Sequence, residues 1–299
     1  MKKLSKDNKQ KAIEYIKKNA RPLDMAVFEK HFNNGSSDNV LSELEKYQND
    51  DGGFGNAIEP DIRSKLSSPI GTSYALQYIE RLGLDDEVDL IDKALTYFDS
   101  TYKPETKQWY SISSEINDFP HAPWWTFNEE KEKSDEGWGN PTVEILGYIA
   151  KYGDISKYQE AYDKALKRIN EKESIETHEL QCYFRFYNLI PEADRKQIEK
   201  ALFDHIDNTV ESDPSKWEGY VTKPLTFVDS PNSPLYEKFS SVIELELDMV
   251  VDSQGEDGGW TPTWEWGTYP EVLGEVKVEL GGMITVGSLI LLDKFGRLE

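Results

Sequence analysis

One helix-like segment occurs three times in this chain of 299 residues, and the repetition limits the folds that it can adopt. Residues 72–83, 142–153 and 285–296 align without gaps, and 177–188 is a degraded fourth copy. The three segments share Thr at the first position, Leu at the fifth and Gly at the last: Thr72, Leu76 and Gly83; Thr142, Leu146 and Gly153; Thr285, Leu289 and Gly296. Thr near the start, a buried Leu and a terminal Gly are typical of a helix that stops in the left-handed conformation.

A second repeated unit precedes two of these helices. QNDDGGFG at 48–55 matches QGEDGGWT at 254–261, and DEGW at 135–138 is a partial third copy. A Gln amide can satisfy free backbone groups at helix ends, paired glycines permit a tight turn, and the aromatic residue can pack. Helix pairs that repeat in this way must stack side by side to bury their apolar faces. The chain is therefore expected to be an array of paired helices.

Apolar periodicity predicts further helices, and no segment alternates like a strand. The additional helices are expected near 88–98, 158–169, 198–206 and 236–250. Asp85 or Asp86 can cap the first of them, and the other face of the last carries acids, Glu246 among them. Asn140 and Pro141 fit an N-cap followed by Pro at the first helical position. We expect an all-α chain of about ten or eleven helices, with long loops at 52–69, 103–138 and 211–234.

The charge pattern excludes some partners. The formal net charge is −22, so nucleic acid and anionic membranes are not expected as partners. Residues 1–20 hold seven Lys and form a basic leading helix, which can be solvated or can dock on the acidic remainder of the chain. A single cysteine, Cys182, excludes a disulfide framework. The N-terminus has no apolar stretch like that of a signal peptide, so we expect a cytoplasmic protein with one domain over 1–299.

The turn motif resembles that of a known superfamily. Q-x-x-D-G-G-[FW] followed by a helix is similar to the repeat of the terpenoid cyclase and protein prenyltransferase superfamily, and DGGFGNAIEPDIR with HAPWW resembles an uncharacterised bacterial subgroup of it. The resemblance covers most of 22–296. It implies an α/α toroid, in which inner helices line a central cavity and outer helices surround them, with long loops at one end. Toroids include prenyl-transferring, sugar-cleaving and non-catalytic proteins, so the fold does not fix the activity.

The catalytic motifs of the resembled families are incomplete here. The D-x-D-D acid of the cyclases is absent, and the D-D-x-x-D string at 85–89 lies at a helix start, where acids act as caps. The zinc site of the prenyltransferases needs Asp two residues before its Cys, but Leu180 precedes Cys182 there. His178 and Cys182 are four residues apart and offer only two metal ligands. We therefore predict no metal and no cofactor.

Two glutamates are the first candidates for catalysis. Glu59 and Glu265 each follow the aromatic residue of their turn by five positions, so the repeat is expected to place them at one end of the toroid. Pro60 favours an extended backbone at Glu59, which would put Asp61 and Arg63 on the same side. Carboxylates that flank a pocket can perform acid–base chemistry on a glycoside. Alternatively, Asp61 and Arg63 form an ion pair that fixes the loop, and Glu265 is a solvated acid.

Aromatic residues accompany these acids in the loops. Seven of the eight tryptophans occur in two windows, and Trp124, Trp125, Trp264 and Trp266 are candidates for a ligand-binding wall, since indole faces suit sugars, prenyl chains and cations. His121 lies inside one aromatic loop and is a candidate for proton transfer. The other interpretation is a packed loop histidine.

Two functions follow from these residues. The first is an enzyme in which Glu59, Asp61, His121 and Glu265 are catalytic and Arg63 and the four tryptophans bind the substrate, with an oligosaccharide favoured over an isoprenoid-like lipid. It predicts that these residues converge on one pocket, where at least one carboxylate has a raised pKa. The second is a non-catalytic toroid that binds a small molecule or a protein. It predicts a narrow or plugged cavity and acids paired with Arg63 or lysines.

Overall fold

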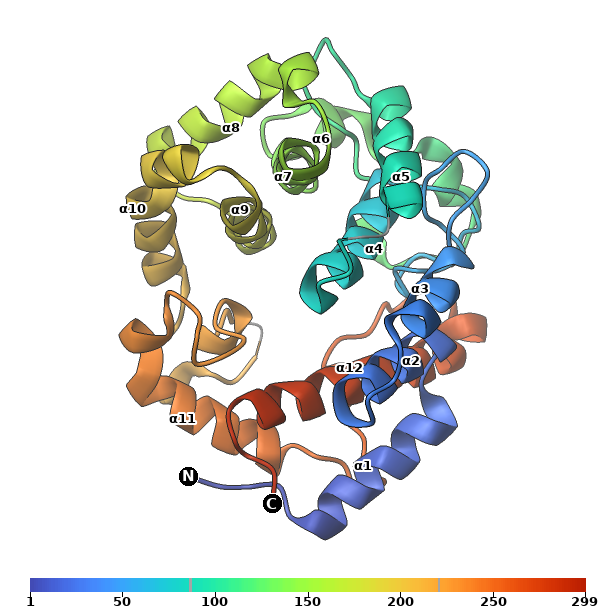
Figure 1. Ribbon diagram of the computed structural model, residues 1–299, viewed down its shortest axis with the longest axis vertical. Coiled ribbons are helices and arrows are strands. Elements are labelled where there is room, and N and C mark those ends of the chain that lie inside the picture. The colour runs from blue at the N-terminus through green and yellow to red at the C-terminus, as the bar shows by residue number, and fades with distance from the viewer. Residues whose placement is uncertain (86–87, 220) are drawn as a thin grey trace. The chain divides into compact units, whose positions relative to one another are not determined.

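The chain is all-α, as the periodicity predicts. The structure is a computed structural model, which describes residues 1–85, 88–219 and 221–299 (Figure 1). These residues form twelve α-helices and five short 3₁₀ helices, and their β pairing is confined to isolated bridges. They divide into two compact units: unit 1 comprises Met1–Leu44 and Thr209–Glu299, and unit 2 comprises Glu45–Asn208. The single toroid domain over 1–299 stays a prediction.

Unit 2 is built from two rows of helices. α4, α7 and α9 lie next to one another in one row, and α5, α8 and α10 form a second row behind them (Figure 1). The helices of this unit are α4 (Pro69–Leu82), α5 (Val88–Thr101), α6 (Glu129–Lys133), α7 (Thr142–Tyr152), α8 (Gln159–Glu171), α9 (Thr177–Leu189) and α10 (Glu192–Thr209). The first row contains the repeated segments at 72–83, 142–153 and 177–188. Gly147 lets α7 approach α9, because a Cβ there would lie 2.9 Å from Leu189 Cδ1.

In unit 1 the N-terminal helix packs against the C-terminal one. The helices here are α1 (Lys6–Asn19), α2 (Pro22–Phe32), α3 (Ser37–Glu45, ending at the boundary), α11 (Tyr236–Asp252) and α12 (Pro270–Lys294). The basic leading segment docks on acids of α11: Lys2 N donates to Asp248 Oδ1 (2.6 Å) and Lys2 Nζ pairs with Asp252. The first residues of this segment are therefore docked on the acidic part of the chain, which is one of the two expected alternatives.

The glycine-rich turn after α3 fastens α5 to α4 in unit 2. Gln48 Nε2 donates to Leu90 O in the first turn of α5 (3.0 Å). Phe54 N donates to Thr72 Oγ1 on α4 (2.9 Å). Gly52 has φ +86°, and a Cβ there would lie 2.3 Å from a carbonyl oxygen of α5. The expected roles of the Gln and Gly residues of the motif are confirmed in this copy.

The second copy of the turn makes the same contacts in unit 1. Gln254 Nε2 donates to Asn8 O in the first turn of α1 (2.9 Å), and Trp260 N donates to Thr285 Oγ1 on α12 (2.9 Å). Gly258 has φ +94°, and a Cβ there would lie 2.5 Å from a carbonyl oxygen of α1. α1 therefore packs on the second turn in the way that α5 packs on the first turn. It does so although α1 precedes the second turn by more than two hundred residues along the chain.

The aromatic residue of the third copy is not the expected one. Trp109 N donates to Thr142 Oγ1 (3.1 Å), the same bond that the aromatic residues of the other two copies make to their Thr. Trp138, from the DEGW string, instead donates its Nε1 to Lys107 O (2.9 Å). The third turn has lost its Gln, Asp and Gly residues, which explains why the sequence pattern selects the wrong tryptophan. It keeps the Trp–Thr bond, and Trp109 Nε1 donates to Phe98 O of the preceding helix (2.7 Å) as Trp260 Nε1 donates to Val250 O (2.8 Å).

The ends of several helices differ from expectation. Gly83 and Gly296 stop their helices at φ +60° and +64°, as predicted, but Gly153 has φ −129° and is not left-handed. α7 begins at Thr142, so Pro141 precedes the first helical residue instead of occupying it. The Asp85 carboxylate accepts hydrogen bonds from a lysine and a tyrosine of α7, and its expected role as a cap stays a prediction. The other proposed cap, Asp86, lies outside the described residues.

α12 is twice as long as the predicted segment, and Thr285 lies in its middle. Gly281 and Gly282 lie inside this helix. A Cβ at Gly281 would lie 2.4 Å from Tyr15 Oη, and a Cβ at Gly282 would lie 2.5 Å from Ala20 Cα. These glycines permit the close approach of α1 and do not end the helix.

Candidate functional site

Six of the nine candidate residues lie on two paired loops of unit 2. Ile62 and His121 form an antiparallel bridge between the two loops. On either side of it, Ala122 N donates to Asp61 O and Arg63 N donates to Pro120 O (both 2.9 Å). This pairing joins the loop that carries Glu59, Asp61 and Arg63 to the loop that carries His121, Trp124 and Trp125. The association of these two loops, from residues about sixty apart in sequence, gives the candidates a common location.

The acidic loop is a turn and not the extended segment that Pro60 suggests. Ile62 N donates to Glu59 O (2.9 Å), which closes a four-residue turn with Pro60 in its second position. Within the turn, Asp61 N donates to Glu59 Oε1 (3.2 Å), and Asp61 is 6% exposed. The Glu59 carboxylate therefore supports its own backbone turn.

His121 is held on both sides of its ring. It is 4% exposed, and its Nδ1 lies 2.7 Å from Phe119 O while its Nε2 lies 3.1 Å from Thr126 Oγ1. A carbonyl oxygen can only accept, so Nδ1 carries the proton, and in the neutral ring Nε2 accepts from the Thr126 hydroxyl. These contacts favour the packed loop histidine over the proton-transfer interpretation.

The two tryptophans of this loop differ in exposure. Trp125 packs against a cluster formed by Ile62, Ile70, Ile112 and Ile116, so it belongs to the core of the loop region. Trp124 is 44% exposed. Trp124 is therefore the more exposed of the pair, and Trp125 is partly buried.

The remaining three candidates belong to unit 1. Glu265 accepts a hydrogen bond from Lys277 Nζ (2.5 Å), and this ammonium group lowers the pKa of Glu265. The expectation of a raised pKa is therefore wrong for Glu265. Trp266 is buried, whereas Trp264 is 37% exposed, so the two do not form one open wall. The convergence of all nine candidates on one pocket stays a prediction.

Two other carboxylates have a raised pKa. Burial raises the pKa of Glu246 on α11 to about 7, even though Leu225 N donates to its Oε2 (2.8 Å). Burial also raises the pKa of Glu132 on α6, which accepts from Ser111 N (2.9 Å). The sequence pattern misses both, since it assigns Glu246 to the polar face of its helix and Glu132 to a charged loop.

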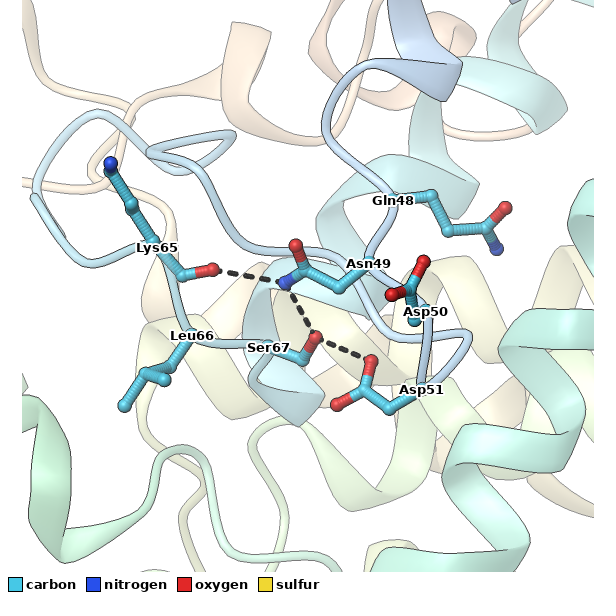
Figure 2. Close-up of a pocket in the computed structure, with 7 residues that line it drawn as sticks. All are labelled: Gln48, Asn49, Asp50, Asp51, Lys65, Leu66 and Ser67. Carbon is cyan, nitrogen blue, oxygen red and sulfur yellow. Dashed lines mark hydrogen bonds between the residues drawn. The ribbon is translucent and has the colours of Figure 1, made fainter.

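A surface depression of roughly 440 Å³ lies beside the first turn motif (Figure 2). Its lining consists of polar residues and one exposed leucine, namely Gln48, Asn49, Asp50, Asp51, Lys65, Leu66 and Ser67. Figure 2 shows the bonds that fix its walls: Asn49 Nδ2 donates to Lys65 O and to Ser67 Oγ (both 2.9 Å), and Ser67 Oγ donates to Asp51 Oδ1 (2.7 Å). Among the described residues, no hydrogen bond or ion pair joins the Asp50 carboxylate or the Lys65 ammonium group to another side chain.

The space next to Glu59 is much smaller. A cavity lined by Glu59, Ile58 and Ile62, with residues of the first turn, holds about 10 Å³. Such a space accommodates no more than one water molecule. This cavity beside Glu59 is therefore too small for a sugar ring.

No metal centre is formed by the residues described here. Across residues 1–85, 88–219 and 221–299, no three His, Cys, Asp or Glu side chains are grouped as metal ligands require. His178 Nδ1 lies 2.7 Å from Glu176 Oε1, and Cys182 is buried, which raises the pKa of its thiol. Within the same ranges, no helix has the length and apolar character needed to span a membrane.

Comparison with known proteins gives no relative: no protein-family model, no curated protein and no solved structure matches the chain. The resemblance of the turn motif to the toroid superfamily therefore enters the functional argument only as a proposal.

Proposed function

We propose that the protein binds a small polyhydroxylated ligand, of the carbohydrate class, in the depression beside the first turn motif. One observation carries the proposal: the Asp50 carboxylate and the Lys65 ammonium group, which make no side-chain contact within the described residues, border an open depression whose walls are already fixed by internal hydrogen bonds. Sugar hydroxyls both donate and accept, so they suit a lining that holds both acceptors and donors. A preformed site also reduces the entropy lost on binding.

The polar lining disfavours the isoprenoid alternative. Leu66 is the one apolar side chain of the lining, and a prenyl chain needs a predominantly apolar channel. Binding without catalysis is favoured because His121 is engaged on both ring nitrogens and Glu265 is paired with a lysine. Acid pairing with lysine is what the non-catalytic hypothesis predicts.

We further propose that the repeats of the two units belong to one α/α toroid. The support is the equivalence of their turns: each Gln reaches the first turn of the helix behind it, and each aromatic residue donates to the Thr of a repeated segment. A closed ring needs its last turn to use its first helix, as Gln254 does with α1.

The binding proposal is tested by saturation-transfer NMR and calorimetry with a panel of mono- and oligosaccharides. We expect a saturable interaction that Asp50→Ala or Lys65→Ala weakens. Glu256→Ala is the matched control, because Glu256 is the counterpart of Asp50 in the second copy and is likewise exposed. Equal loss in all three variants, or no binding by the wild type, contradicts the proposal. Hydrolysis of a bound sugar overturns the non-catalytic assignment.

A further inference from the structure

A carboxylate is almost completely buried in unit 1, where a loop packs on α11. The loop forms the 3₁₀ helix η5 (Pro224–Thr226), which contacts α11. Glu246 of α11 is 8% exposed, and its Oε2 accepts from Leu225 N of η5 (2.8 Å). Its Oε1 has no donor within the part of the chain that the structure describes. The packing of η5 on α11 therefore encloses a carboxylate and gives it one hydrogen bond.

Other backbone hydrogen bonds of η5 run within the loop itself. Phe227 N and Val228 N both donate to Pro224 O (3.0 and 3.1 Å). These bonds do not involve α11, so η5 can leave α11 with them intact. Phe227 is 2% exposed and Val228 is fully buried, and this apolar burial opposes such a movement. Release of η5 therefore needs a driving force, which a buried charge on Glu246 provides.

The charges around Glu246 do not compensate it. Lys223, which precedes η5, is the one charged side chain of the described residues that acts on the pKa of Glu246, and it forms no ion pair with it. Other charged groups on α11, on the loop and on the 3₁₀ helix η4 (Pro214–Lys216), which also packs on α11, are engaged elsewhere: Glu244 and Asp248 with Arg297, Asp229 with Lys294, and Lys216 with Glu211. Burial therefore raises the pKa of Glu246 to about 7, against the opposing effects of Leu225 N and Lys223.

We propose that the contact between η5 and α11 is a pH-sensitive switch, in which protonation of Glu246 holds η5 on α11 and rising pH loosens it. When η5 leaves, Glu246 becomes solvated and its pKa returns toward 4.5. The docked form binds the proton more tightly, so docking is strongest below about pH 4.5 and weakens as the pH rises to about 7. The difference in pKa corresponds to a loss of at most about 300-fold in the docking equilibrium. This switch lies in unit 1 and does not depend on the proposed sugar site.

The test is hydrogen exchange of the Leu225 amide in the full chain, followed by NMR between about pH 5 and pH 8 and corrected for the intrinsic pH dependence of exchange. We expect the protection factor to fall by up to about tenfold per pH unit and to level off above about pH 7. The buried Trp260 amide, which donates to Thr285 Oγ1, is the internal reference for larger opening. Leu225 should exchange at least about tenfold faster than Trp260 at each pH, because η5 opens without the rest of unit 1.

Glu246→Gln keeps an oxygen that can accept from Leu225 N and removes the charge, so its Leu225 protection should not fall with pH. Glu237→Gln is the matched control, because Glu237 is an exposed acid on the same helix, and it should behave like the wild type. The proposal is overturned if Glu246→Gln keeps the pH dependence of the wild type, or if the wild-type protection of Leu225 does not fall. Equal protection of Leu225 and Trp260 also overturns it, and this wild-type comparison decides the question even if Glu246→Gln does not fold.

Discussion

Replacing Gly258 with alanine perturbs the packing of the second turn on α1 in two ways at once. The φ of +94° is a conformation that costs an L-residue about 1–2 kcal/mol. The added Cβ would lie 2.5 Å from the carbonyl carbon and oxygen of Lys11, so α1 would have to shift or bend. Overpacking of this kind typically costs about 1–3 kcal/mol. We therefore expect Gly258→Ala to lower the free energy of unfolding by about 3 kcal/mol.

Gly267→Ala is the matched control. Gly267 also has a positive φ, +71°, but a Cβ there would meet no atom within 4 Å. It should show only the conformational cost, about 1–2 kcal/mol. Urea unfolding followed by circular dichroism measures both, and hydrogen exchange of α1 should show faster opening in Gly258→Ala alone. If Gly258→Ala costs no more than Gly267→Ala, the turn does not pack on α1 as described.

Two further predictions concern buried acids. Glu246→Gln should stabilise the protein at about pH 8 by up to about 3 kcal/mol, at about 1.4 kcal/mol per pKa unit, and change its stability little near pH 4. The reason is that folding raises the pKa of Glu246 from 4.5 to about 7, so the cost of burying its charge develops as the pH rises through that window. Urea unfolding at the two pH values measures this, and equal effects at both would refute it. Glu179→Gln should destabilise the protein by about 3–5 kcal/mol, since it leaves the buried Arg168 without its bidentate partner. Asp135→Asn removes a largely exposed partner of Arg168 and should cost less than about 1 kcal/mol. A lower thermal-denaturation midpoint for Asp135→Asn than for Glu179→Gln would contradict the assignment of Glu179 as the main partner of Arg168.

The repeat was predictable because the same residue types make the same contacts in each copy. Gln48 and Gln254 bond to the backbone of their own turn and to the first turn of one helix, and this role needs the same residue at the same spacing each time. The Thr residues accept from the turn's aromatic residue for the same reason. An all-α fold and most helix positions follow from this repetition and from the apolar period.

The candidate site was less predictable because it depends on contacts between distant residues. The pairing of Asp61 with Ala122 is a loop-to-loop contact that no periodicity reveals. The extended geometry inferred from Pro60 fails, since Pro also suits the second position of a turn. Glu144 and Arg185 lie inside helices whose apolar pattern is intact, so the pattern gives no sign that the two side chains meet.

The most direct test of the repeat is an NMR measurement on the unmodified protein. Gly259 lies against the ring of Tyr15 on α1 as Gly53 lies against the ring of Tyr97 on α5, because a Cβ at either glycine would overlap the ring. We predict ring-current-shifted Hα signals for both glycines, with nuclear Overhauser effects from Gly259 to Tyr15 and from Gly53 to Tyr97. If Gly53 shows its Overhauser effect while Gly259 shows none to Tyr15, α1 is not the partner helix of the last turn, and the equivalence of the two turns is contradicted.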